Sequence, residues 1–184
     1  MLLARNVSKS FDKPVLTNFS FDFPQTGTVL IRGASGCGKT TLLRILAGLE
    51  KQDTGEICAS RDIRISCVFQ EARLVPHLSV LGNLLLVRDT KDKTKALAIL
   101  KELGLEQDAH KFPHQLSGGM RLRVAIARSL YYGGNVFLWD EPTKELDPEN
   151  RVKIRDIIQR LSQNACVIVV THDSDLTGST EINL

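Results

Sequence analysis

The residues best suited to chemistry in this sequence form a glycine-rich segment that ends in Lys39 and Thr40. A Gly-x4-Gly-Lys-Thr spacing between an apolar strand and an amphipathic helix is typical of a phosphate-binding loop, and a chance match in a glycine-rich turn is the alternative. Glycines tolerate positive φ, so backbone N–H groups can curl around an anion where the helix begins. Lys39 is expected to reach the β- and γ-phosphates, and the Thr40 hydroxyl to bind Mg²⁺. The predicted nucleotide-binding residues are Gly33, Ala34, Ser35, Gly36, Cys37, Gly38, Lys39, Thr40 and Thr41.

Two adjacent carboxylates, Asp140 and Glu141, follow the apolar run 136–139. In open α/β sheets, ligands bind where the strands end. Asp140 is therefore expected to hold the Mg²⁺ that Thr40 also binds. Glu141 is expected to act as the general base that takes a proton from the attacking water. A solvated acidic pair at a strand end is the alternative, which an intact phosphate loop disfavours.

Gln70 and His172 also follow apolar runs. The Gln70 amide is a candidate to contact the metal or the attacking water, although a lone glutamine is more often a surface hydrogen bonder. His172 is a candidate sensor of the γ-phosphate, although a lone histidine at a strand end is more often structural.

A second candidate anion site is Ser117-Gly118-Gly119, at the start of a predicted helix that runs to about residue 131. A hydroxyl and two glycine N–H groups at a helix N-terminus favour an anion. One triphosphate held by residues 33–40 has no obvious need of a second site in the same chain. These residues are therefore predicted to serve the nucleotide of another subunit, the alternative being a simple helix cap.

The elements that must position these residues follow from hydrophobic periodicity. Phe19, Phe21 and Phe23 alternate on one face of a strand, which predicts antiparallel strands before the phosphate loop. The helix after the loop is expected to bury Leu42, Ile45, Leu46 and Leu49. Core strands are predicted at 29–31, 65–69, 136–139 and 166–171, with a helix starting at Pro148.

Residues 71–131 have a helical character that interrupts the α/β pattern, and a helix over 94–103 is expected to turn Leu97, Leu100 and Leu103 inward. The prediction is one domain over residues 1–184. It is an α/β fold with a P-loop NTPase core, an N-terminal antiparallel β layer and a helical subdomain inserted at about 71–131.

The composition is ordinary for a globular protein, with 42% hydrophobic and 24% charged residues in 184. The net charge of +3 is too small to indicate a nucleic-acid partner. No segment has the length of a membrane span or a signal peptide, and the four cysteines have no metal-binding spacing. These features predict a cytoplasmic protein.

The motifs together resemble the ATP-binding subunits of ATP-binding-cassette (ABC) transporters over essentially the whole chain. Residues 33–40 match the Walker A motif, Gln70 the Q-loop, 116–120 the signature and 136–140 the Walker B strand. Glu141 and His172 fall on the catalytic glutamate and the switch histidine. Phe11, which lies 28 residues before Lys39, falls where the family places an aromatic ring on adenine, the alternative being a core residue at a strand edge.

Three positions depart from the family pattern. Met120 replaces the usual signature glutamine, while Lys144 and Glu145 replace small residues near the expected dimer seam. The two charges put symmetric homodimerisation in question. The chain also ends 12 residues after His172, where members usually carry a helix, and residues 180–184 are expected to form a short closing strand.

The resemblance implies an ATPase that uses ATP and Mg²⁺ and powers a membrane transporter. Its expected partners are a second ATP-binding subunit, as a homo- or heterodimer, and separate transmembrane permease subunits. It would lie peripherally on the inner face of the membrane, with residues 71–83 against the permease. Residues 69–83 look most similar to those of importers of the nitrate, sulfonate and taurine type. Two alternatives are a soluble ABC-type ATPase in a non-transport process and a subunit that binds ATP without turnover.

Overall fold

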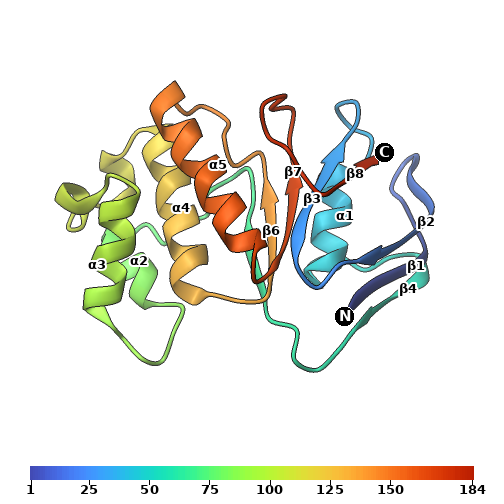
Figure 1. Cartoon of the computed structure of the whole chain (residues 1–184), viewed down its shortest axis with the longest axis horizontal. Coiled ribbons are helices and arrows are strands. Elements are labelled where there is room, and N and C mark those ends of the chain that lie inside the picture. Colours follow the sequence, from blue (N-terminus) through green and yellow to red (C-terminus); the bar gives the residue numbers. More distant parts are fainter.

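The computed structural model describes all 184 residues, and its centre is a parallel five-stranded sheet with the order β5-β6-β7-β3-β8 (Figure 1). Every neighbouring pair in this sheet is parallel, so all strands end at the same edge. The three central strands, β6, β7 and β3, are mostly apolar and buried, as expected for a sheet covered on both faces. The bounds of the five strands are β3 Gly27–Arg32, β5 Ile65–Val68, β6 Val136–Asp140, β7 Cys166–Val170 and β8 Thr180–Asn183.

A second sheet of three antiparallel strands has the order β2-β1-β4. It consists of β1 Leu2–Ser10, β2 Pro14–Phe23 and β4 Thr54–Ala59, and confirms the predicted N-terminal β layer. Helix α1 (Lys39–Leu46) lies between the two sheets, and its apolar side chains share one core with strands of both. In that core Phe23 is buried, and Phe19 and Phe21 pack against it, as the alternation predicts.

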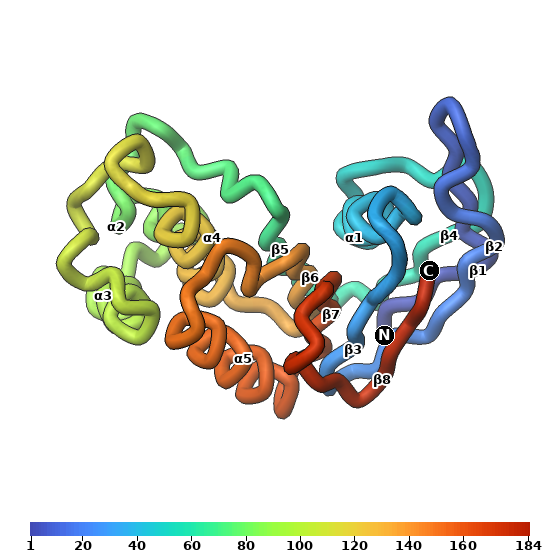
Figure 2. Tube along the Cα trace, turned by 90° about the horizontal axis from the view of Figure 1, so that it is seen from above, coloured from blue at the N-terminus to red at the C-terminus, as the bar shows by residue number.

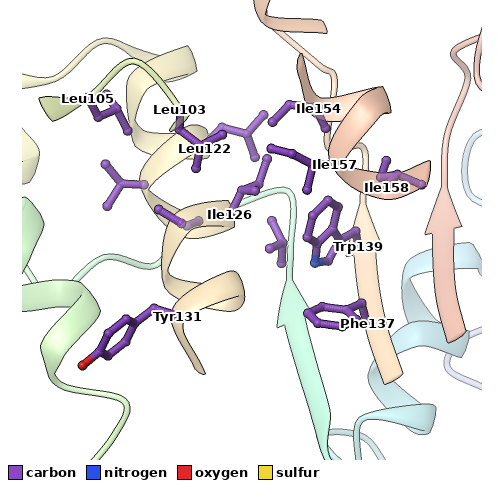
Figure 3. Close-up of a cluster of buried hydrophobic side chains, with 14 of the residues drawn as sticks. Leu103, Leu105, Leu122, Ile126, Tyr131, Phe137, Trp139, Ile154, Ile157 and Ile158 are labelled. Atoms are coloured by element: carbon purple, nitrogen blue, oxygen red, sulfur yellow. The ribbon is translucent and has the colours of Figure 1, made fainter. Parts of the chain in front are cut away.

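The other face of the parallel sheet is covered by helices (Figure 3). Phe137 and Trp139 of β6 point into a cluster with Ile126 of α4 and Ile157 of α5. Figure 2 shows the helical part and the antiparallel strands at opposite ends of the molecule, with the parallel sheet between them. None of the helices combines the length and apolar character needed to span a membrane. The helices are α2 Val80–Leu85, α3 Lys93–Glu102, α4 Gly118–Tyr132 and α5 Pro148–Ser162, with single 3₁₀ turns at Glu106–Asp108 and Pro113–Gln115.

Two predicted core positions are wrong. Leu97 is 38% exposed because α3 buries Ala96, Leu100 and Leu103 instead, a spacing that places Leu97 beside the contact face rather than on it. Leu49 is 55% exposed because α1 ends earlier than its hydrophobic spacing suggests. Gly48 takes a φ of 69°, and the N–H of Leu49 turns back to donate to the carbonyl of Arg44 at 2.8 Å. This is the geometry of a glycine-terminated helix, and it points Leu49 away from the core.

Candidate functional site

The carboxyl ends of β3, β5, β6 and β7 meet at one edge of the sheet, and a cavity of about 570 Å³ lies there. The glycine-rich loop after β3 forms one wall. Gln70, Asp140, Glu141 and His172, which follow the other three strands, also line the cavity. The parallel sheet therefore brings together residues of the loop and the strand ends that are up to 137 positions apart, from Ser35 to His172.

Backbone geometry in the glycine-rich loop leaves the start of α1 open. Gly36 and Gly38 have φ values of 81° and 101°, in the region that favours glycine. A Cβ on Gly38 would lie 2.7 Å from the carbonyl oxygen of Val15, so a side chain does not fit there. Gly38 is the N-cap of α1 and offers no side chain to the first N–H groups. These groups are free to bind an anion, aided by the helix dipole.

Lys39 is the cation of this loop, and it is only 7% exposed. Its Nζ donates to the carbonyl oxygens of Gly33 at 2.9 Å and Ala34 at 2.8 Å, both within the loop. No carboxylate lies within 4.0 Å of this ammonium group, so its charge is not neutralised within the chain. A nearly buried ammonium that contacts only carbonyl oxygens and the sulfur of Cys37 is a strong attractor for phosphate.

Thr40 and Asp140 are joined directly: the Thr40 hydroxyl donates to Oδ2 of Asp140 at 2.6 Å. Asp140 is 1% exposed, and burial raises the pKa of its carboxyl. The hydrogen bond from Thr40 and the charge of Lys39 oppose that rise. Two oxygen donors already in contact fit Mg²⁺, which usually takes one or two protein ligands and completes its shell with phosphate and water. The Gln70 amide lines the same cavity and is a further oxygen donor.

Glu141 has a φ of 52°, a strained value for a residue with a side chain. Its N–H donates to the carbonyl of Val170 at 2.9 Å, which fixes it at the end of β7. One carboxylate oxygen accepts from the backbone N–H of His172 at 3.4 Å, and the other lies 3.6 Å from Nε2 of that histidine. Such strain is concentrated at functional sites, and Glu141 and His172 both line the cavity.

The loop after His172 is held by arginines that sequence reasoning missed. Arg155 of α5 forms a two-pronged ion pair with Asp173, at 2.7 and 3.1 Å. Arg32 donates to the carbonyl of Asp173 at 3.1 Å. The position of Asp173 directly after His172 was the available signal. Sequence spacing does not show that its partner, Arg155, lies on α5.

Ser117, Gly118 and Gly119 do not line the 570 Å³ cavity, so one chain does not bring them to its own phosphate loop. Ser117 caps α4 and accepts from the N–H of Met120 at 3.2 Å. A Cβ on Gly118 would lie 2.8 Å from Oε2 of Glu145, which places that carboxylate over the start of α4. Gly118 lines a smaller hollow of about 210 Å³ that the cavity residues Gln70 and Glu141 also border.

Phe11 lies in the turn between β1 and β2, at the rim of the cavity. It is 59% exposed, so the expected alternative of a core residue is wrong. Lys9 approaches its ring, with Nζ 5.2 Å from the centroid. Val15 and Val170 also line the cavity, and sequence reasoning assigned neither of them, because an apolar residue in a strand carries no local sign of a binding role.

Comparison with known proteins agrees with this geometry. The sequence pattern of the ABC transporter family matches residues 16–144. An aliphatic sulfonates import ATP-binding protein of Agrobacterium fabrum is 38% identical over 92% of this chain and 64% of its own length. The corresponding protein of Shouchella clausii is 40% identical over 92% of this chain and 70% of its own length. An Fe(3+) ions import ATP-binding protein of Haemophilus influenzae is 38% identical over 95% of this chain and 56% of its own length. The chain thus spans between about half and about seven tenths of these relatives.

Among solved structures, the ATP-binding cassette MJ0796, in a dimeric post-hydrolysis state bound to ADP and Pi, superposes with a TM-score of 0.91. It is 32% identical, and the match covers 100% of this chain and 94% of that one. A second dimeric structure of the same bacterial transporter cassette gives a TM-score of 0.92 at 30% identity, with the same coverage. The α/β architecture with two sheets is therefore shared over the full length described.

Proposed function

We propose that this chain, which belongs to the ABC transporter family, binds ATP with Mg²⁺ and hydrolyses it. The hydrolysis powers a transporter whose membrane-spanning subunits are separate chains. The observation that carries the proposal is the shared cavity. It joins a phosphate-binding loop, the Thr40–Asp140 contact and the Glu141–His172 pair at one sheet edge.

The roles of the residues follow from their positions. The N–H groups at the start of α1 and the ammonium of Lys39 bind the phosphates. Thr40, Asp140 and Gln70 would hold Mg²⁺, which when bound neutralises charge on the phosphate oxygens. Glu141 takes the proton of the attacking water on its carboxylate. His172, beside that carboxylate, orients the water and the terminal phosphate.

A second cassette completes the site. Ser117, Gly118 and Gly119 lie at the start of α4, away from the chain's own phosphate loop. We propose that they contact the nucleotide of a second subunit, which is the same chain or a related one. The two dimeric cassette structures superpose on this chain over its full length, and this supports such pairing.

The relatives named above are import proteins for aliphatic sulfonates and Fe(3+) ions. We therefore propose an importer subunit, bound to the cytoplasmic face of the membrane through its permease. Residues 71–83 are the proposed contact. Asn83 is buried and organises this segment, since its side-chain amide accepts from the N–H of Val75 at 2.8 Å and donates to the carbonyls of Val75, Leu78 and Ser79.

Affinity purification from detergent-solubilised native membranes tests the transport role. Leu74 packs against the helical core, so a charge there would also disturb folding. Pro76 and His77 are exposed, and Pro76→Asp/His77→Glu is the better variant. We expect the wild-type chain to retain a multi-spanning protein and the double variant to lose it while still binding ATP. Val152→Asp on α5, another exposed position, is the control. Equal retention by all three proteins would contradict the assignment of residues 71–83.

A further inference from the structure

Lys144 is a positively charged residue to which the proposed mechanism of ATP binding and hydrolysis assigns no role. It follows β6 in the loop that leads to α5, and its side chain lines the nucleotide cavity. It also borders the hollow of about 210 Å³ beside Gly118 and another of about 310 Å³ beside His172. Glu141 lines all three spaces, so Lys144 and Glu141 lie at their junction.

The loop holds Lys144 at this junction through its backbone. The N–H of Lys144 donates to the carbonyl of Glu141 at 3.1 Å, and the N–H of Leu146 donates to the carbonyl of Thr143 at 3.4 Å. Thr143 and Leu146 are both buried and anchor the turn on either side. The backbone of Lys144 is therefore held in place, while its side chain is exposed.

The charge of Lys144 has no partner within the chain. No carboxylate lies within 4.0 Å of its Nζ, although several line the same spaces. Lys144 lines the same cavity as Lys39, Asp140 and Glu141, so its unpaired charge adds to that of Lys39 in the nucleotide site.

Phe11 lines the nucleotide cavity but neither of the two smaller hollows that Lys144 borders. The two neighbouring hollows that it borders contain Gln70, Glu141 and His172 but no residue of the phosphate loop. Lys144 therefore lies beside Glu141, the residue proposed to act on the water that attacks the terminal phosphate. A diphosphate held by the same loop would not extend there.

We propose that Lys144 contacts the γ-phosphate of ATP and makes the isolated subunit discriminate ATP from ADP. This inference rests on the proposed nucleotide site. A partly solvated charge-assisted contact is expected to strengthen binding of the triphosphate by about three- to twentyfold. It is expected to leave binding of the diphosphate unchanged.

Calorimetric titration with Mg²⁺ and either ADP or the non-hydrolysable analogue AMP-PNP tests the proposal. Lys144→Met should weaken AMP-PNP binding by about three- to twentyfold and change ADP binding by less than about twofold. Lys144→Arg should retain most of the discrimination, because it keeps the charge and the reach. Lys91→Met, an exposed lysine in the helical part, is the matched control and should bind both nucleotides as the wild type does.

Three results would overturn the role of Lys144: unchanged AMP-PNP binding by Lys144→Met, equal weakening for both nucleotides, or a weakening that grows with protein concentration. The last would place the lysine in subunit pairing instead. Failure of the underlying site is distinguishable. A wild-type chain that binds neither nucleotide, or a Lys39→Ala chain that binds both normally, would refute the nucleotide site itself.

Discussion

The hydroxyl of Thr40 donates to Oδ2 of Asp140 at 2.6 Å, across 100 positions of sequence. This hydrogen bond joins the first turn of α1 to the end of β6, two elements that also share the core between the sheets. It holds two oxygen atoms at the spacing of neighbouring ligands and keeps the Asp140 carboxylate inside the protein. Burial of this carboxylate is unfavourable in free energy, and a divalent cation bound beside it would offset that cost.

The first prediction concerns Asp140→Asn. Because burial raises the pKa of Asp140, the folded chain binds its proton more tightly than the unfolded chain does. Stability from this group therefore falls as pH rises from the ordinary value of about 3.9 through the raised pKa. The neutral amide avoids this loss, so the nucleotide-free variant should be more stable than the wild type at pH 7–8. A gain of about 1 kcal/mol would raise Tm by about 2–4 °C.

Thermal unfolding between pH 4 and 8 measures this effect, and the difference between variant and wild type should shrink toward pH 4. The variant should also lose the part of nucleotide stabilisation that depends on Mg²⁺. A variant that is less stable at every pH, or that keeps the full Mg²⁺ effect, would contradict the role given to Asp140.

The second prediction compares two leucines of α3. Leu100 is buried against α4, while Leu97 is 38% exposed. Leu100→Ala should lower the free energy of unfolding by about 2–5 kcal/mol, since it removes buried methyl groups and leaves a cavity. Leu97→Ala should cost less than about 1 kcal/mol. Urea denaturation measures both, and equal losses would mean that α3 packs through a different face.

The third prediction concerns the four free cysteines. Burial raises the pKa of Cys67 to about 11 and of Cys166 to about 12, so both should react slowly with a maleimide. Cys37 is partly exposed in the phosphate loop, with its sulfur 3.8 Å from Nζ of Lys39. It should be labelled ahead of Cys67 and Cys166, and MgATP should protect it. Peptide mass spectrometry identifies the labelled site, and labelling of Cys37 that is unaffected by saturating MgATP would place the nucleotide elsewhere.

Much of the fold was predictable because its signals are local. The P-loop spacing, the phenylalanine alternation of β2 and the helix start at Pro148 each require a particular backbone geometry. The predicted closing strand is β8, and the helix predicted from Ser117 is α4. Leu49 and Leu97 were misplaced for a different reason. Hydrophobic periodicity shows that a helix has an apolar face. Where α1 ends and which side of α3 packs against the core depend on tertiary structure.

The same distinction applies to the candidate site, where some residues were predictable from the local sequence and others were not. Residues at strand ends were predictable, because a parallel sheet gathers its carboxyl ends at one edge. The Arg155–Asp173 ion pair and the placement of Glu145 over Gly118 were not, since each depends on how a loop folds back on a helix. Lys144 was visible only as a departure from the family pattern, and its direction into the cavity required the structure.

Phosphate release decides whether Glu141 is the general base with which this chain hydrolyses ATP. Steady-state phosphate release at saturating MgATP is compared for the wild type and Glu141→Gln, with ATP binding measured in parallel. The amide keeps the size of the side chain but cannot accept the proton. Hydrolysis should therefore fall by about 10²–10⁴-fold while ATP binding is retained. A Glu141→Gln protein that binds ATP and hydrolyses it at the wild-type rate would contradict the claim.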